Sequence, residues 1–385
     1  MKAHRIQVHG LDLVRFIAAI LVSVYHLGFR AWASPGHTLN EQLAITPFRP
    51  NGWEYSCFGW VGVQIFFVIS GFVIAYSAEG ATPIAFIRSR ISRLVPAMWI
   101  GTSFSVIVLI AWGQYDSLGY LYIKSLFFAP IGPWICGVYW TLGIEIVFYA
   151  LIFCLLLFDR FRWLPHVSLI ISVLSACFWI GIDSHTFTDK FPRATQLLLL
   201  NHGCYFALGT ALWLIHRRGL TVVNICVCLL CLFAAHSQIN STNNIEAISN
   251  GIMGISSFTP FVIWCISIAI IILSVTYGSI FAKTLAPVSS NTIRLLGLMT
   301  YPLYLIHFHI GGAAMIVAYK SGLAPAYALS IGISTSLLFS FFITAYMESF
   351  VKRKLLTFLG WIADQLKGRI SAASYLFRDT KTLPF

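Results

Sequence analysis

Long apolar runs alternate with short polar segments along almost the whole chain. Each run is close to the roughly 20 apolar residues that a helix needs to cross a bilayer. The sixth and seventh runs are separated only by His216-Arg217-Arg218-Gly219, which is typical of a tight helical hairpin. The pattern predicts ten membrane-spanning helices, at residues 11–31, 58–77, 97–114, 138–158, 166–183, 199–215, 220–236, 258–276, 297–318 and 325–347.

The composition agrees with this pattern. Hydrophobic residues make up 58% of the 385 residues, charged residues make up 10%, and the mean hydropathy is +0.82. Soluble domains are about 25% charged, so we expect an all-α polytopic membrane helical bundle with no appended soluble catalytic domain. No cleavable signal peptide is evident, because the first apolar run contains Asp12, Arg15 and His26 and lacks a small-residue cleavage site after it.

The net charge of +12 is interpreted as topology, and no nucleic-acid partner is predicted, because Lys and Arg collect on the cytoplasmic side of membrane proteins. With the N-terminus placed inside, 18 of the 25 Lys and Arg residues fall on inside segments and six on outside segments, with Arg15 in a span. We therefore predict that both termini are cytoplasmic. Residues 1–350 would form the membrane domain, and residues 351–385 a basic cytoplasmic tail attracted to anionic lipid.

The nine cysteines show no metal-binding spacing, and no metal is predicted. Most lie in apolar runs, where cysteine behaves as a packing residue. Cys57 and Cys136 fall in segments predicted to lie outside the membrane. A disulfide between them and two unpaired thiols both stay open.

Two ionisable side chains share one face of the first predicted span. Arg15 and His26 are 11 residues apart, close to three helical turns, and therefore about 16 Å apart along the helix axis. This places Arg15 near the cytoplasmic boundary and His26 in the outer half of the membrane. Ionisable groups within a bilayer are costly and point to function. The alternative is structural: Arg15 extends to the inner headgroups and His26 bonds a neighbouring helix.

Glu145 is the third such residue, and it follows Trp140 in the fourth predicted span. That span enters from outside, so Glu145 is about 10 Å deep. His26 and Glu145 are at compatible depths, and an imidazole oriented by a carboxylate is a general-base arrangement for deprotonating a hydroxyl. The alternative is a buried His–Glu pair with a structural role only.

Arginines gather in a predicted loop at the cytoplasmic end of the third span, in Arg88-Ser89-Arg90-Ile91-Ser92-Arg93. Arg90 and Arg93 are three residues apart and would share a helix face. The guanidinium fork suits phosphate groups. Alone, these residues fit ordinary positive-inside charge; beside Arg15 at the same membrane face, they predict an anion-binding mouth.

The ninth predicted span contains two histidines after a proline. His307 falls near mid-membrane, and Pro302 leaves one backbone carbonyl unpaired. Catalytic and structural roles for His307 both stay open. His309 points about 200° away around the helix, which makes it the weaker candidate. The pair Ser70-Gly71 in the second span indicates close helix packing.

Five of these segments, taken in order, resemble the acyltransferase-3 family of bacterial membrane O-acyltransferases, which modify surface polysaccharides and related glycans. The resemblance covers most of the chain. The matching motifs are Arg15 with His26, Phe66-Phe67-Val68-Ile69-Ser70-Gly71-Phe72, Arg90-Ile91-Ser92-Arg93 before Leu94-Val95-Pro96, Trp140-Thr141-Leu142 with Glu145, Phe148 and Tyr149, and Tyr301-Pro302-Leu303-Tyr304-Leu305-Ile306-His307.

One departure concerns the end of the last span, where the family often follows a glutamate with proline. Here Glu348 is followed by Ser349-Phe350, which puts the local turn in doubt. Some family members carry a fused periplasmic esterase-like domain. This chain extends only about 35 residues past its last predicted span, too few for such a domain.

The resemblance implies an acyl-CoA donor, acetyl-CoA above all, that enters from the cytoplasm of a bacterial inner membrane. The acceptor would be a hydroxyl of a cell-surface or lipid-linked glycan. Under this hypothesis Arg15, Arg90 and Arg93 bind the donor, His26 assisted by Glu145 activates the acceptor, and His307 is a further catalytic candidate. The alternatives are a proton-coupled transporter of an anionic or lipid-linked substrate, since intramembrane His and Glu also form proton relays, and a structural subunit of polysaccharide assembly.

Overall fold

The structure is a computed structural model that describes residues 9–182, 192–250, 256, 258–278 and 289–360, and these residues form helices and no strand. The helices in chain order are α1 (His9–Val24), η1 (Tyr25–Arg30), α2 (Ala31–Ala33), α3 (Thr38–Leu43), η2 (Trp53–Tyr55), η3 (Gly59–Val61), α4 (Gly62–Ala78), α5 (Pro83–Ala111), α6 (Leu118–Leu126), η4 (Gly137–Tyr139), α7 (Trp140–Leu157), η5 (Phe161–Trp163), α8 (Leu164–Ile180), α9 (Arg193–Leu197), α10 (Gly203–Arg218), α11 (Val222–Ser249), α12 (Phe258–Thr276), α14 (Ser290–Ile306), η6 (His307–Gly311), α15 (Gly312–Lys320), α16 (Pro325–Phe342) and η7 (Ile343–Met347).

The all-α polytopic fold is confirmed. Within the described residues, nine helices are long and apolar enough to cross a membrane, one fewer than the ten predicted spans. The difference is the sixth, predicted at 199–215. Its helix α10 has 16 residues, about 24 Å of rise against a hydrocarbon core of about 30 Å. This helix is buried against α4, α8 and α11, so its apolar sequence reflects burial inside the bundle.

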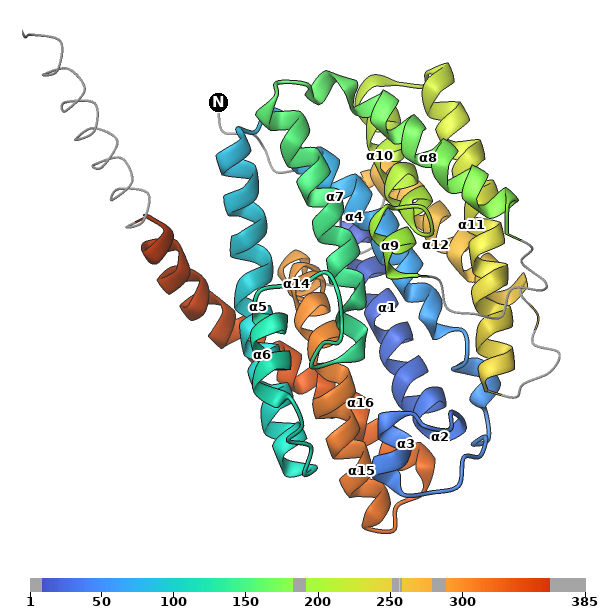
Figure 1. Ribbon diagram of the computed structural model, residues 1–385, viewed down its shortest axis with the longest axis vertical. Coiled ribbons are helices and arrows are strands. Elements are labelled where there is room, and N and C mark those ends of the chain that lie inside the picture. Colours follow the sequence, from blue (N-terminus) through green and yellow to red (C-terminus); the bar gives the residue numbers. More distant parts are fainter. Residues whose placement is uncertain (1–8, 183–191, 251–255, 257, 279–288, 361–385) are drawn as a thin grey trace, which may run out of the picture.

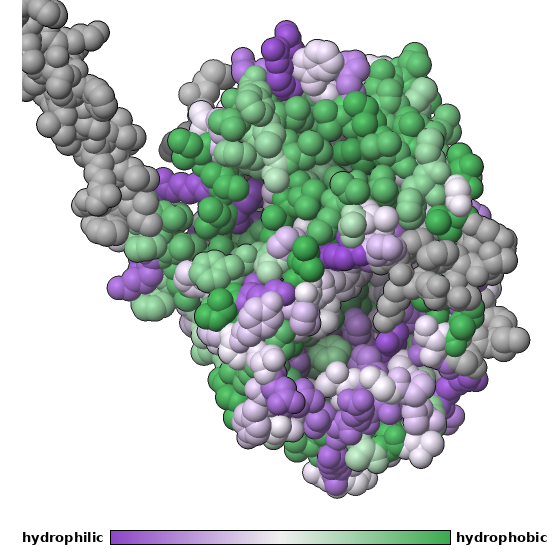
Figure 2. All heavy atoms as spheres, viewed as in Figure 1, coloured by the Kyte–Doolittle hydropathy of each residue, from purple (hydrophilic) through white to green (hydrophobic). Residues whose placement is uncertain are grey.

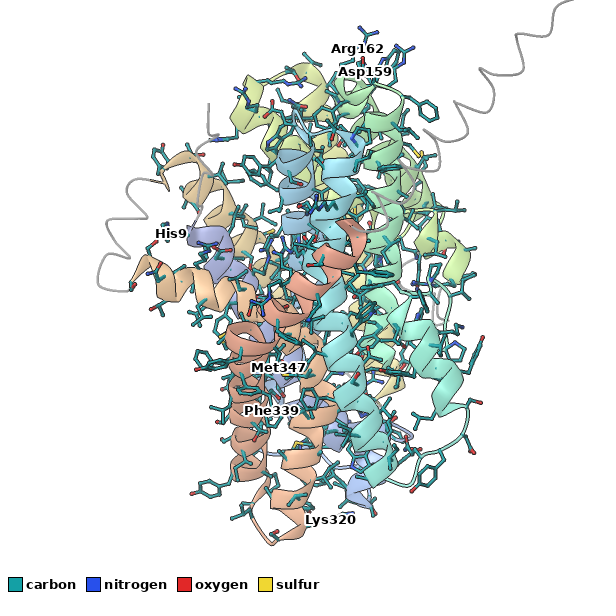
Figure 3. All side chains as sticks on the ribbon, turned by 90° about the vertical axis from the view of Figure 1, so that its left-hand side faces the viewer. His9, Asp159, Arg162, Lys320, Phe339 and Met347 are labelled. Atoms are coloured by element: carbon teal, nitrogen blue, oxygen red, sulfur yellow. The ribbon has the colours of Figure 1, made fainter. Side chains whose placement is uncertain are left out.

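The long helices run roughly side by side, and α1 lies inside the bundle (Figure 1), where it packs against α4, α12 and α14. Lys320 lies at one end of the molecule, and Asp159 and Arg162 lie at the other (Figure 3). The predicted topology puts these residues on opposite sides of the membrane. Hydrophobic side chains cover much of the upper part of the face in Figure 2, and hydrophilic ones gather at the lower end. The cytoplasmic location of the termini stays a prediction.

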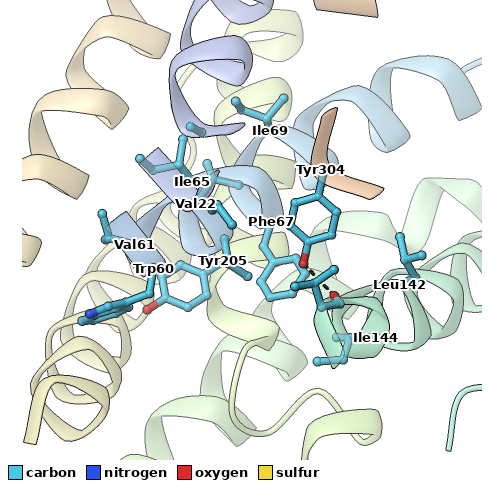
Figure 4. Close-up of a cluster of buried hydrophobic side chains, with 14 of the residues drawn as sticks. Val22, Trp60, Val61, Ile65, Phe67, Ile69, Leu142, Ile144, Tyr205 and Tyr304 are labelled. Carbon is cyan, nitrogen blue, oxygen red and sulfur yellow. Dashed lines mark hydrogen bonds between the residues drawn. The ribbon is translucent and has the colours of Figure 1, made fainter. Parts of the chain in front are cut away.

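Close contact between α4 and α10 depends on glycine. A Cβ added at Gly71 would meet the backbone carbonyl of Phe206, and one added at Gly209 would meet the carbonyl of Val68 and lie 2.8 Å from the nitrogen of Phe72. The two helices therefore approach backbone to backbone, which small residues allow in membrane bundles. The packing role predicted for Gly71 is confirmed. Next to this contact, Phe67, Ile65 and Tyr205 belong to the buried core (Figure 4).

Substitution of Gly209 by valine is expected to prevent this approach and to destabilise the bundle by about 1–3 kcal/mol or more, the usual cost of overpacking. The measurement is the yield of monodisperse protein in detergent and its midpoint of thermal unfolding. Gly119→Ala is the control, since an added Cβ there meets nothing within 4 Å. Equal midpoints for the Gly209 variant and the control would contradict the packing argument.

The arginine segment of residues 88–93 is helical, and the prediction of a loop was wrong. Helix α5 begins at Pro83, because the Thr82 side chain caps it by accepting from the Ala85 nitrogen at 3.2 Å. Proline fits the first turn of a helix, and Pro96 does not end α5. Arg90 and Arg93 therefore share one face of a continuous helix, as their spacing predicted.

The last described helix is also longer than predicted and runs from Pro325 to Gly360, with a π-helical segment at Ile343–Met347. Glu348 lies within this helix. The absence of proline after Glu348 lets the helix continue where the family pattern predicts a turn. Beyond Met347 the helix runs towards one side of the bundle (Figure 1), and Val351 and Leu355 still pack against it. The boundary predicted at residue 350 is not tested, and residues 361–385 of the predicted tail lie outside the described residues.

Candidate active site

A large cavity opens among α1, α5, α14 and the last helix. Its volume is about 1130 Å³, just above the roughly 300–1,000 Å³ of typical small-molecule pockets. Among the described residues, its basic lining outnumbers its acidic lining. The Arg and Lys residues are Arg15, Arg90, Arg93, Arg294 and Lys352, and the acidic residues are Asp12 and Glu348. The three arginines predicted to bind the donor are therefore brought together, at the end predicted to be cytoplasmic. We call this space the arginine cavity.

Each predicted arginine has a defined environment. Arg15 is paired with Asp12 one turn earlier on α1, at 3.8 Å between Nη1 and Oδ1. Arg90 is buried, and its guanidinium lies over the rings of Phe86 and Tyr149 at 5.6 and 5.7 Å. The Nε atom of Arg90 has no hydrogen-bond partner. A buried cation held by aromatic faces, with a free donor beside a cavity, is suited to an anionic ligand.

Glu145 does not orient His26, and the predicted His26–Glu145 pair is wrong. The Glu145 carboxylate accepts hydrogen bonds from Ser70 at 3.0 Å and Tyr149 at 2.7 Å. The reason is that α4 packs between α1 and α7, so Ser70 of α4 reaches Glu145 first. Depth alone could not show this intervening helix. Tyr149, which donates to Glu145, also has its ring beneath the guanidinium of Arg90. Glu145 therefore lies behind the wall of the arginine cavity, which Arg90 lines.

His26 instead meets two other histidines near the opposite end of α1. Its ring centroid lies 5.3 Å from that of His307 and 6.2 Å from that of His37, which is nearly parallel to it. Phe308 packs against both His26 and His37. The Nδ1 atom of His26 is buried without a hydrogen-bond partner. We call His26, His37 and His307 the histidine cluster.

The local backbone explains why these rings converge. His26 lies in the π-helical segment η1, and His307 begins the π-helical segment η6. A π-helical turn shifts side chains around the helix axis and often marks a functional site. It also frees carbonyl groups, and His307 Nδ1 lies 2.9 Å from the Tyr304 oxygen and 3.2 Å from the Leu303 oxygen.

The hydrogen bonding of His307 determines its tautomer. A carbonyl oxygen only accepts, so Nδ1 carries a proton, and in the neutral form of the ring Nε2 then holds the lone pair. This Nε2 is buried and has no hydrogen-bond partner. Tyr304 is itself held, because its hydroxyl donates to the Val138 carbonyl at 2.8 Å and lies 2.9 Å from the Thr141 hydroxyl (Figure 4). His307 is therefore an oriented imidazole that faces His26.

The remaining predictions about single residues have clear outcomes. His309 packs against Trp112 at 5.8 Å, away from the histidine cluster, as its angle on the helix predicted. Cys57 and Cys136 are both free and buried, which answers the open alternative in favour of unpaired thiols. Among the described residues, no group of three or more His, Cys, Asp or Glu side chains has a geometry that could hold a metal ion.

Sequence reasoning missed His37, which precedes α3 outside the predicted spans. A histidine in a polar loop gives no signal of burial, and only the folded segment brings it to His26. Burial, with the positive charge of Arg30 nearby, lowers the pKa of His37 to about 3. This lowered pKa favours the neutral form of His37 near neutral pH.

Replacement of His37 by glutamine is expected to weaken the acid sensitivity of folding. The pKa of histidine in the unfolded chain is about 6.5. Below that pH, the unfolded chain therefore binds a proton at His37 that the folded protein does not bind. The free energy of unfolding therefore falls as the pH drops from 6.5 towards 3. Between pH 7 and pH 5, His37 alone lowers it by up to about 2 kcal/mol. Unfolding in detergent at both pH values, for wild type and His37→Gln, measures the difference. Equal losses in the two proteins would show that His37 is not held neutral.

A helical membrane bundle with a basic cavity and an oriented imidazole in its interior is an enzyme-like arrangement for an anionic substrate. A family model described as an acyltransferase domain, Acyl_transf_3, matches residues 8–345. The chain therefore belongs to the acyltransferase-3 family, and the nine long apolar helices among its described residues are those of a multi-pass membrane protein.

Two curated relatives are similar over parts of their length. Nodulation protein 10 of Rhizobium leguminosarum bv. viciae is 26% identical over 210 residues, 48% of this chain and 53% of the relative. Exopolysaccharide production protein ExoZ of Rhizobium meliloti (strain 1021) is 37% identical over 123 residues, 29% of this chain and 38% of the relative. The matches thus span about half or less of these relatives. No solved structure matches the chain.

Proposed function

We propose that the protein transfers an acyl group, acetyl above all, from acyl-CoA to a hydroxyl of a cell-surface or lipid-linked glycan in the bacterial cytoplasmic membrane. The observation that carries this proposal is that the arginine cavity and the histidine cluster lie next to each other along helix α14 and the segment η6 that follows it. Tyr301 of α14 lines the cavity, and His307 begins the next segment six residues later, about 9 Å along the axis.

The arginine cavity fits the donor. Coenzyme A carries phosphate groups at one end and its thioester at the other, joined by a long flexible arm. Arg15, Arg90 and Arg93 would bind the phosphates, for which the guanidinium fork is suited. The arm would then extend along α14 and bring the thioester to the histidine cluster.

The histidine cluster fits the acceptor reaction. The hydroxyl oxygen attacks the thioester carbonyl while the hydroxyl proton passes to a free imidazole nitrogen of His26 or His307. The carbon–sulfur bond then breaks, the departing coenzyme A thiolate takes that proton, and the free thiol leaves. Both residues have such a nitrogen, and a positioned base of this kind is typical of acyl transfer. The name of the relative ExoZ, an exopolysaccharide production protein, supports a polysaccharide as acceptor.

Membranes that contain the protein should move radiolabel from acetyl-CoA to glycan, and membranes without it should not. Mass spectrometry of surface glycans, with and without the protein, would identify the acylated position. Proton-coupled uptake of a substrate without label transfer would reject acyl transfer and favour a transporter.

A further inference from the structure

One carboxylate of α11 binds both ends of the π-helical segment that carries His26. Glu246 accepts a hydrogen bond from the Tyr25 hydroxyl at 2.5 Å. It also accepts from Arg30, whose Nη1 lies 2.9 Å from Oε2 and 3.2 Å from Oε1. Tyr25 is the first residue of η1 and Arg30 is the last. The two ends of this one turn are thus tied to a residue more than 200 positions away in sequence.

We call the contacts of Glu246 with Tyr25 and Arg30 the clamp, and its hydrogen bonds extend beyond η1. Asn250 donates to a Glu246 oxygen at 3.2 Å, and the Ser34 hydroxyl donates to the Asn250 side chain. Side-chain exposure is 26% for Arg30 and 22% for Glu246. An ion pair that is largely shielded from water, and that also receives neutral hydrogen bonds, fixes geometry more firmly than an exposed pair.

A contact transmits this geometry to the histidine cluster. The ring of Tyr25 meets the ring of His26 edge-on, with centroids 5.0 Å apart. A π-helical turn is rare and has no strong intrinsic preference, so its shape depends on contacts with other helices. Glu246 supplies such contacts at both ends of η1, and Tyr25 packs directly on the histidine.

We propose that Glu246 is a positioning residue that holds η1 in its π-helical shape and thereby aims the His26 ring at His307. This inference rests on the proposed function, because it assigns Glu246 a role in acyl transfer through His26. The Glu246 carboxylate bonds to Tyr25, Arg30 and Asn250 and makes no hydrogen bond to the histidine cluster.

The test is label transfer from radiolabelled acetyl-CoA to endogenous glycan in membranes, with rates normalised to the amount of folded protein. Glu246→Ala is expected to lower kcat roughly 10- to 100-fold, the effect of misplacing a reacting group by about 1 Å. The KM for acetyl-CoA is expected to stay unchanged, because the arginine cavity is elsewhere. Glu246→Asp, which keeps the charge, should recover part of the rate.

The matched control is Glu79→Gln, which breaks a more exposed carboxylate–arginine pair with Arg217, 3.1 Å long. It is expected to leave kcat unchanged. Unchanged kcat in Glu246→Ala, while His26→Ala lowers transfer by about 100-fold or more, would overturn the positioning role and leave the proposed function standing. Full transfer by His26→Ala would instead reject the proposed mechanism itself.

A double variant separates positioning from a general structural role. If Glu246 acts through His26, Glu246→Ala should cause no further loss in the residual rate of His26→Ala, because residues that act as one unit are not additive. A full 10- to 100-fold additional loss in that background would show that Glu246 merely supports the fold. Tyr25→Phe, which removes one hydrogen bond from the clamp, should give a smaller loss of kcat than Glu246→Ala.

Discussion

Replacement of His26 or His307 by alanine is expected to reduce acyl transfer by about 100- to 10,000-fold, the usual contribution of a positioned general base. The two rings face each other at 5.3 Å, and each has a buried nitrogen without a hydrogen-bond partner. The loss should appear in kcat, because neither ring lines the arginine cavity. Label transfer in membranes, at saturating acetyl-CoA, measures it.

The pair should behave as one unit. The double variant His26→Ala with His307→Ala is expected to be little slower than either single variant, since each alone removes the function of both. His309→Ala is the control on the same π-helical segment, because His309 packs on Trp112 and not on His26. Independent, multiplying losses would show that the two histidines act at separate steps. A single variant with full activity would remove that residue from the mechanism.

The sequence predicted the fold and the grouping of the arginines because both follow from local rules. Span length is set by bilayer thickness, and arginines three apart share a helix face in whatever bundle contains them. The motif spacing placed Arg15 and His26 on one helix, and the structure puts Arg15 on the cavity and His26 in the histidine cluster.

The partners of His26 could not be predicted in the same way. Glu145 was expected at the depth of His26, but its carboxylate bonds to Ser70 and to Tyr149, whose ring lies beneath Arg90. Helix α4 packs against both α1 and α7, and an estimate of depth carries no information on which helices are neighbours. The π-helical segments at His26 and His307 leave no recognisable periodicity in sequence, because one extra residue per turn is compatible with the same apolar pattern. His37 comes from a polar segment, so nothing in the hydropathy indicates that its ring packs against His26.

Replacement of Arg90 by methionine is expected to raise the KM for acetyl-CoA about 10- to 100-fold with little change in kcat. Arg90 is 6% exposed, and its guanidinium lies over Phe86 and Tyr149 at the cavity wall. A hydrogen bond to a charged group contributes about 1.5–3 kcal/mol, which corresponds to this range. Methionine keeps the packing against the two rings and removes the charge.

The matched control is Arg88→Met, on the same helix but exposed and outside the cavity lining; its KM should equal that of the wild type. A second donor identifies what Arg90 recognises. Acetyl-pantetheine carries the thioester and the arm without the nucleotide phosphates, so Arg90→Met should not change its KM. If Arg90 binds phosphate, the preference of the wild type for acetyl-CoA over acetyl-pantetheine shrinks in the variant by the same factor as the rise in KM. An equal rise in KM for both donors would mean that Arg90 shapes the cavity and does not bind phosphate.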